Sequence, residues 1–403
     1  MKSVKFTNIK YESSTKITFE VIDIQDEHIN SYKFFYEFSC ENHPSYDALA
    51  LSFSCMLGIK LYDQIYIDLD LSRSTINAIR SFNQCVVECR QLVEENLEKK
   101  SSTNDIVLLN FSGGMDSLAA LSLFPKDKTK IISIEFNGRF NRESDFFKEF
   151  HPYILRTNFR ESDFFKKLES KSWQFMGIGS ILYCEKFKAK YFTFGTILEA
   201  DNNLNCNVQS VVKPFSGADL SYISAINGLT EVGTTKLAYE CYGEKISKSL
   251  KSLADEGTVK RLRKDLLASL FSDSVNIHSV KNFKFGKDYV FDFLCFYFIK
   301  NKGIKFISQY ISNIPEEVID LAIKLNLKFY EKLNPKALIT FNNSSLYDFY
   351  IVKLFSFGFG IYDENDYYEL SKVRACLSKF YKQENKHKSL YCKCDREKLG
   401  RHE

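Results

Sequence analysis

Hydrophobic and polar residues alternate one by one in three segments near the N-terminus: residues 4–12 (VKFTNIKYE), 15–24 (TKITFEVIDI) and 63–71 (DQIYIDLDL). Such alternation puts every second side chain on the same face of an extended chain, so it predicts three β-strands. Between them, apolar residues recur at helical spacing after Ser45, a favoured helix N-cap type, and predict a helix over 45–59. Residues 73–99 carry an amphipathic pattern that predicts one long helix.

The polar segment 99–105 (KKSSTND) predicts a linker and a domain boundary, because the pattern changes directly after it. Apolar runs typical of buried strands then alternate with helical patterns. Strands are predicted at 105–111, 130–136, 153–159 and 190–196, and helices at 117–124, 144–150, 162–171 and 177–189. Strand–helix alternation of this kind predicts an α/β fold with a parallel, doubly wound sheet.

Beyond residue 230 the pattern is mostly helical, with helical periodicity over 258–271, 291–311 and 315–333. We therefore expect three consecutive domains. They are a small α+β domain over 1–100, an α/β domain over 105–245, and a mostly helical C-terminal region over 246–403.

The composition narrows the class of protein. Hydrophobic content of 44% and charged content of 26% are typical of a soluble globular chain, and no apolar run is long enough to predict a membrane span. The polar N-terminus shows no secretory signal, so the 11 cysteines are expected to be thiols in a reducing cytoplasm. A net charge of +4 argues neither for nor against nucleic acid as a partner.

The segment SGGMDS, Ser112–Ser117, stands between a predicted buried strand and a predicted helix. In a chain with only 17 glycines, Gly113 and Gly114 in succession permit a tight turn whose N–H groups point at the helix N-terminus. Such donors favour an anion, and the two serine hydroxyls add to them. Asp116 would repel a phosphate unless a cation lies between them, so the loop predicts a Mg²⁺-phosphate site.

Further candidates follow the fourth strand of this predicted sheet. Gly195 and Thr196 lie at its carboxyl end, where open α/β sheets bind ligands, and Glu199 and Asp201 come next as candidates for contacting metal or substrate. Lys236, in GLTEVGTTKLA (228–238), is a candidate for contacting phosphate or substrate; a solvated surface lysine is the alternative.

The S-G-G-x-D-S pattern, between a buried strand and a helix, resembles the loop of the N-type PP-loop ATP pyrophosphatases. The resemblance implies an adenine nucleotide alpha hydrolase-like sheet and cleavage of ATP between its α- and β-phosphates. It implies catalytic roles for Ser112, Asp116, Ser117 and Lys236. The nucleotide would contact Ser112, Gly113, Gly114, Met115, Asp116, Ser117, Gly195 and Thr196, with Glu135, Phe136 and Asn137 near the adenine.

Residues 105–240 are similar to 7-cyano-7-deazaguanine synthase. This resemblance implies that ATP activates a 7-carboxy-7-deazaguanine-like carboxylate, which ammonia or another amine then attacks. The additional N- and C-terminal regions resemble those of elaborated relatives in bacterial antiviral defence clusters, and they would recognise a protein partner.

The same family carries a C-terminal zinc site of four cysteines. Here the corresponding candidates are Cys376, Cys392 and Cys394, completed by His402 or His387. Three unliganded thiols are the alternative.

Two other functions are compatible with the loop. One is a tRNA-modifying PP-loop enzyme, for which the lysine-rich stretches 258–264 and 379–401 would contact RNA. The other is a module of a defence complex that binds ATP without turnover.

Overall fold

The computed structural model describes residues 1–94, 104–136, 141–168, 173–201, 204, 206, 209–278, 280, 283–341 and 344–381. The chain forms two compact units that are interleaved along the sequence. Unit 1 comprises Met1–Ser112, Pro125–Phe194 and Val208–Ile223. Unit 2 comprises Gly113–Phe124, Gly195–Asn207 and Ser224–Glu403.

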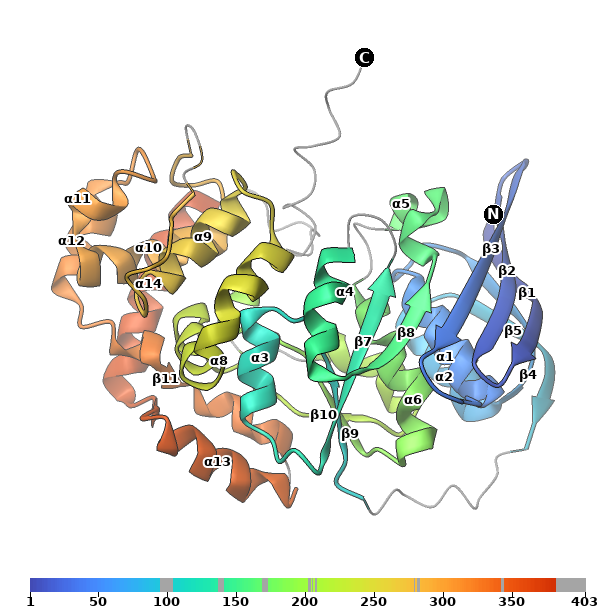
Figure 1. Cartoon of the computed structure of the whole chain (residues 1–403). Helices are drawn as coiled ribbons and strands as arrows, with labels where there is room; N and C mark the ends of the chain where they lie inside the picture. The colour runs from blue at the N-terminus through green and yellow to red at the C-terminus, as the bar shows by residue number, and fades with distance from the viewer. Residues whose placement is uncertain are drawn as a thin grey trace. The chain divides into compact units, whose positions relative to one another are not determined.

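Unit 1 is built on one large mixed sheet (Figure 1). Its strands are β1 (Lys2–Ser13), β2 (Lys16–Gln25), β3 (His28–Phe38), β4 (Gln64–Ser72), β5 (Val86–Val93), β6 (Val107–Asn110), β7 (Thr129–Phe136), β8 (Tyr153–Thr157), β9 (Tyr191–Thr193) and β10 (Ser221–Tyr222). They are ordered β10-β9-β6-β7-β8-β3-β2-β1-β4-β5. Most neighbouring strands are parallel; the antiparallel pairs are β8–β3, β3–β2 and β2–β1.

The strands predicted near the N-terminus are confirmed as β1, β2 and β4, and those predicted after residue 105 as β6 to β9. The two sets share one sheet, because β3 pairs with β8 through Glu37↔Arg156 and Phe38↔Leu155. The chain is therefore an α/β protein with a large, mostly parallel sheet. The predicted division into domains at residues 100, 105 and 245 stays a prediction.

The prediction of one helix over 73–99 is wrong. The helix α2 (Arg73–Asn83) ends where Gln84 adopts a left-handed conformation with φ of 55°, and β5 then runs parallel to β4. The segment VVECRQLV of β5 is rich in β-branched valine, which favours strands, and pairing with β4 overrides its weak helical periodicity.

The helices of unit 1 are α1 (Tyr46–Met56), α2, α4 (Asn141–Phe147), α5 (Asp163–Leu168), α6 (Ile178–Phe187) and α7 (Gln209–Ser216). Ser45 caps α1 as predicted, accepting a hydrogen bond from the Ala48 N–H at 3.2 Å. Gly179 lets α6 lie directly on β7, because a Cβ at this position would be 2.7 Å from Cγ2 of Ile132.

Unit 2 is mostly helical, as predicted for the C-terminal region. Its helices are α3 (Met115–Ser122), α8 (Glu231–Leu253), α9 (Val259–Ala268), α10 (Tyr289–Lys302), α11 (Ile304–Ile307), α12 (Glu316–Lys324), α13 (Leu346–Ser356) and α14 (Glu364–Tyr381), with a short β11 (Lys332–Leu333) and β12 (Gly360–Ile361). The helix predicted over 291–311 is interrupted at Gly303, whose φ is 84°. Within the described residues, no helix combines the length and the apolarity that crossing a bilayer requires.

Candidate functional site

The glycine loop, Ser112–Ser117, leads from β6 into α3. Gly113 has a φ of 78°, a conformation that other residues adopt only with strain, and Gly114 is the extended N-cap of α3. Because glycine has no side chain, the cap leaves the approach to the first amides of α3 sterically open. This backbone is compatible with an anion at the start of α3.

Gly195 packs directly against this turn within unit 2. A Cβ at Gly195 would lie 3.0 Å from the Ser117 nitrogen, 3.2 Å from the Asp116 carbonyl carbon and 3.3 Å from the Asp116 Cβ. The absence of a side chain at this position thus sets how closely the segment after β9 approaches the first turn of α3.

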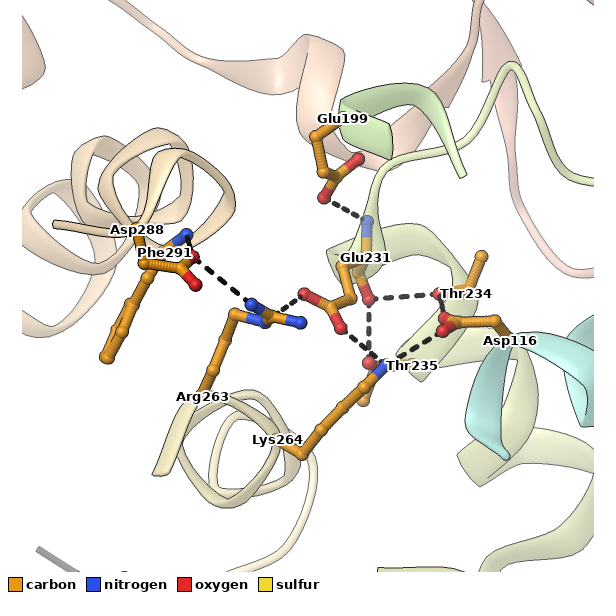
Figure 2. Close-up of polar contacts among 9 residues, drawn as sticks. All are labelled: Asp116, Glu199, Glu231, Thr234, Thr235, Arg263, Lys264, Asp288 and Phe291. Atoms are coloured by element: carbon orange, nitrogen blue, oxygen red, sulfur yellow. Dashed lines mark hydrogen bonds and ion pairs between the residues drawn. The ribbon is translucent and has the colours of Figure 1, made fainter. Parts of the chain in front are cut away.

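The carboxylate of Asp116 is held from two sides (Figure 2). Oδ1 accepts a hydrogen bond from the Thr234 hydroxyl at 2.7 Å, and Oδ2 lies 3.0 Å from the ammonium of Lys264. Lys264 is only 3% exposed, whereas 24% of the Asp116 side chain is accessible. Asp116 is therefore fixed by a buried cation while part of its side chain remains accessible to solvent.

The same ammonium also binds Glu231, with Lys264 Nζ 2.5 Å from Oε1. The second oxygen of Glu231 lies 2.9 Å from Nε of Arg263, whose Nη1 lies 3.3 Å from Oδ1 of Asp288. Burial works to raise the pKa of Glu231, but Arg263 and Lys264 outweigh it and hold this pKa below its usual value. Burial likewise works to lower the pKa of Lys264, but Asp116 and Glu231 raise it. We call these five residues the charged network.

Glu199 adjoins the charged network and has no exposed surface. Its Oε1 accepts the main-chain N–H of Glu231 at 2.7 Å, and its Oε2 has no hydrogen-bond partner among the described residues. Burial, and next the negative charge of Glu231, raise the pKa of Glu199 to about 8. A pKa raised in this way favours the neutral carboxyl near pH 7, and the neutral form has no charge repulsion with Glu231.

Helix ends position the charged network. Thr230 caps α8 and donates its hydroxyl to the Tyr330 carbonyl at 2.6 Å, which fixes Glu231 in the first turn of α8. A carboxylate there is favoured by the helix dipole. Asp288 caps α10 by accepting the Phe291 N–H at 2.8 Å. Farther along α8, the Ser249 hydroxyl donates to the Gly113 carbonyl at 2.8 Å and so ties the helix to the glycine loop.

The geometry of the two carboxylates fits a cation. Asp116 Oδ2 and Glu231 Oε1 both point at one ammonium, so two negatively charged oxygens converge on a single positive charge. Mg²⁺ is commonly held by one or two carboxylates together with phosphate oxygens and water. In the structure the position between these two carboxylates is occupied by the ammonium of Lys264, and the carboxylates alone do not complete an octahedral site.

The structure places the other predicted residues of unit 2 as follows. Met115 is fully buried, and the Ser117 hydroxyl donates to the Gly114 carbonyl at 2.9 Å. Thr196 is half-buried beside Gly195 in the chain, and Asp201 follows the short 3-10 helix η5 (Leu198–Ala200). Lys236 lies on α8 with its ammonium 4.9 Å from the centre of the Phe359 ring. The lysine that contacts Asp116 is Lys264.

Three predicted residues belong to unit 1. Ser112 is half-buried at the carboxyl side of β6. Glu135, 9% exposed, is bound by Ser144, by Nε of Arg156 at 2.5 Å and by Nζ of Lys148 at 2.9 Å. Although burial opposes the shift, these partners lower the pKa of Glu135 to about 2. The neighbouring Phe136 lies under the guanidinium of Arg160, 5.1 Å from the ring centre. Their predicted role near adenine stays a prediction, and Asn137 lies outside the described residues.

The predicted zinc ligands cannot be assembled from the described part of the chain. Cys376 is buried on α14, and burial raises the pKa of its thiol. Cys392, Cys394, His402 and His387 lie outside the described residues. Among the residues that are described, no group of three or more His, Cys, Asp and Glu side chains is arranged to hold a metal ion. The zinc site stays a prediction.

Besides Asp288, sequence reasoning missed four members of the site: Glu231, Thr234, Arg263 and Lys264. Glu231 and Thr234 lie in the segment GLTEVGTTKLA, in which Lys236, the positively charged residue, is the predicted phosphate contact. Arg263 and Lys264 lie in the basic stretch 258–264, and charged residues of this kind are usually exposed to solvent. The available signal was the cap pattern of Thr230 and Glu231, which places an acid at a helix start.

Comparison of the chain with protein-family models, with curated proteins and with solved structures gives no match.

Proposed function

We propose that the protein is an ATP-dependent enzyme that transfers the adenylyl group of ATP to a carboxylate and releases pyrophosphate. The observation that carries this proposal is the pairing of Asp116, in the first turn of α3, with the buried ammonium of Lys264 beside an anion-binding turn. A purely structural strand-to-helix turn has no need for a carboxylate that faces a buried cation shared with Glu231 of α8. A site for phosphate and Mg²⁺ uses both.

The chain's own groups have distinct roles in this reaction. The N–H groups at the start of α3 and the hydroxyl of Ser112 would bind the β- and γ-phosphates. Asp116 and Glu231 would hold Mg²⁺, which, when bound, neutralises charge on the phosphate oxygens. The buried ammonium of Lys264, which lies against Asp116 in the structure, would stabilise negative charge on the departing pyrophosphate.

The proposed chemistry needs no nucleophile from the protein. A carboxylate oxygen of the substrate attacks the α-phosphorus, the bond between this phosphorus and the α,β-bridging oxygen breaks, and pyrophosphate leaves. An amine then attacks the acyl carbon, and AMP leaves with the acyl oxygen. Catalysis thus comes from positioning and from charge stabilisation by Lys264 and the loop amides.

Our assignment of the fold class and of the carboxylate that accepts the adenylyl group rests on a resemblance. The glycine loop and residues 105–240 resemble PP-loop ATP pyrophosphatases. We assign the parallel strands β6 to β9 to an adenine nucleotide alpha hydrolase-like, doubly wound sheet, with β1 to β5 as an added α+β part. The acceptor is a 7-carboxy-7-deazaguanine-like carboxylate, and ammonia or a protein amine is the second nucleophile. We therefore expect the enzyme to act in the cytoplasm, in antiviral defence and together with a protein partner.

The structure provides an argument against the tRNA-modifying alternative. Of the four cations in residues 258–264, Arg261, Arg263 and Lys264 are buried, at 6%, 9% and 3% exposure. Arg261 pairs with Asp265 at 2.7 Å, and the other two belong to the charged network. Cations that are buried and paired with carboxylates are not available to an RNA backbone.

Isotope exchange between ATP and labelled pyrophosphate tests the proposal. With Mg-ATP and 7-carboxy-7-deazaguanine but no amine, we expect label to enter ATP, because adenylate formation is reversible while the adenylate stays bound. Omission of the carboxylate should abolish the exchange. An ATP-binding module without turnover would bind ATP in calorimetry but give no exchange in either mixture.

A further inference from the structure

The strand β5 is an open edge of the sheet in unit 1. It pairs with β4 on one side, and no strand of the described residues pairs with its other side. Edge strands expose unpaired N–H and C=O groups, and proteins usually protect them with proline, a bulge or a very short strand. β10, at the opposite edge, is a two-residue strand. β5 has eight residues, VVECRQLV, without proline, and the one register irregularity in its pairing with β4 inserts the extra residue in β4, between Ile67 and Asp70.

The hydrogen bonds of β5 show which of its main-chain groups face outward. The Val86 N–H donates to the Asp63 carbonyl at 3.0 Å, so Val86 points its main-chain groups toward β4. Because these directions alternate along a strand, the groups of Val87, Cys89 and Gln91 face the open edge. A second strand could therefore bond to β5 through these three residues.

The side chains of β5 are complementary to an antiparallel copy of the same strand. With Cys89 opposite Cys89 of a second molecule, Glu88 stands opposite Arg90, and Val86 stands opposite Leu92. Val86 and Leu92 are exposed by 55% and 54%, so the pairing covers apolar side chains that otherwise face solvent. Arg90 is already held in position by Asp70, with Nε 2.8 Å from Oδ1.

We propose that two copies of this chain associate edge to edge through antiparallel pairing of β5, with the two-fold axis at Cys89. The pairing joins the two sheets into one continuous sheet through about six main-chain hydrogen bonds, two for each facing pair of outward residues. Opposite charges at directly facing positions stabilise such pairs, and like charges destabilise them. This inference does not depend on the proposed adenylation.

The charges select one register. A shift of the axis to residue 88 would bring Glu88 against Glu88 of the second copy, and a shift to residue 90 would bring the two copies of Arg90 together. Only the register centred on Cys89 puts Glu88 and Arg90 opposite each other on both sides of the axis. These two residues face each other at non-hydrogen-bonded positions, where facing side chains are closest.

Charge reversal tests the pairing in solution. We expect the wild-type protein to sediment as a dimer, and Glu88→Arg and Arg90→Glu each to sediment as a monomer, because each variant faces like charges. Mixing the two monomeric variants should restore a dimer, since the mixed pair again faces opposite charges. This rescue cannot arise from misfolding, and circular dichroism of each variant checks that the fold is intact.

Cross-linking tests the position of the axis. Facing Cα atoms of a hydrogen-bonded antiparallel pair are about 5.5 Å apart, a distance that a disulfide spans. Diamide, which takes up the two electrons and two protons of a thiol pair, should link two chains through Cys89, and dithiothreitol should separate them. Cys89→Ser should still sediment as a dimer but give no such link, while Cys85→Ser should behave like the wild type. A monomeric wild type, a Glu88→Arg dimer, failure of the mixture to dimerise, or a link without Cys89 would each overturn the proposal.

Discussion

At the residue scale, Lys264 holds two carboxylates together inside unit 2, and its removal leaves them without a common cation. We expect Lys264→Met to lower the free energy of unfolding by about 3–5 kcal/mol, the usual cost of breaking a buried ion pair on one side. Lys236→Met is the matched control. Lys236 is half-buried and its ammonium lies over the ring of Phe359, so its loss should cost about 0.5–1 kcal/mol.

Urea unfolding of the two variants and the wild type measures both values. Similar losses for the two variants would mean that the contacts of Lys264 with Asp116 and Glu231 contribute little. Pyrophosphate release can also be assayed at a temperature where both variants stay folded. This assay shows whether Lys236 or Lys264 contacts the phosphates. We expect Lys236→Met to retain activity and Lys264→Met to lose it.

Glu199 should make stability fall as the pH rises. Its pKa is raised in the folded protein to about 8 from the ordinary 4.5, so the folded state keeps a proton that the unfolded state has lost. Between these two pH values the folded state binds more protons, and the free energy of unfolding decreases with increasing pH. Glu199→Gln keeps an oxygen for the Glu231 N–H and should remove this decrease.

Unfolding of both proteins across that pH window is the measurement. Asp292, whose pKa burial raises to about 7, acts in the same direction in both proteins and cancels in the difference between them. Parallel pH profiles for the wild type and Glu199→Gln would contradict the assignment of a protonated Glu199.

At the scale of elements, the close approach of Gly195 to the start of α3 sets the shape of the glycine loop. In Gly195→Ala the new Cβ would meet the Ser117 nitrogen at 3.0 Å, so the two segments must separate by a few tenths of an ångström. We expect pyrophosphate release to fall on the order of tenfold or more, because small displacements of positioning groups are costly in catalysis.

Gly243→Ala is the control for this substitution. Gly243 directly follows the kink of α8 at Tyr242, and a Cβ there meets nothing within 4 Å, so alanine should fit without loss of activity. Equal activity of the two alanine variants in a pyrophosphate-release assay would show that the approach at Gly195 is not important.

The elements also show what the sequence could predict. Alternation identified β1, β2 and β4, and the strand–helix alternation after residue 105 identified β6 to β9, because local burial determines both patterns. The pattern of residues 86–93 predicts a helix instead of β5, because the pairing of these residues with β4 is not encoded in local periodicity. The glycine loop was found from its sequence, whereas Arg263 and Lys264 became part of the site only through the packing of α9.

At the scale of the whole molecule, the pairing of β3 with β8 makes the first 94 residues part of the same sheet as the strands after residue 105. A fragment of residues 104–403 would expose the edge of β8 and the ring of Tyr183, which packs on Phe38. We expect this fragment to aggregate when it is expressed alone, and co-expression with residues 1–94 to restore a soluble complex. A soluble, cooperatively folded fragment 104–403 would support the domain boundary predicted from the sequence instead.

The central claim is that the glycine loop and the charged network direct cleavage of ATP between its α- and β-phosphates. Product analysis tests it most directly, with the purified chain, Mg-ATP, 7-carboxy-7-deazaguanine and ammonium, beside the isosteric variant Asp116→Asn. We predict AMP and pyrophosphate in equal amounts, only when the carboxylate is present, and a loss of about 100-fold or more in Asp116→Asn. ADP and phosphate as products, or an unchanged rate in Asp116→Asn, would contradict the claim.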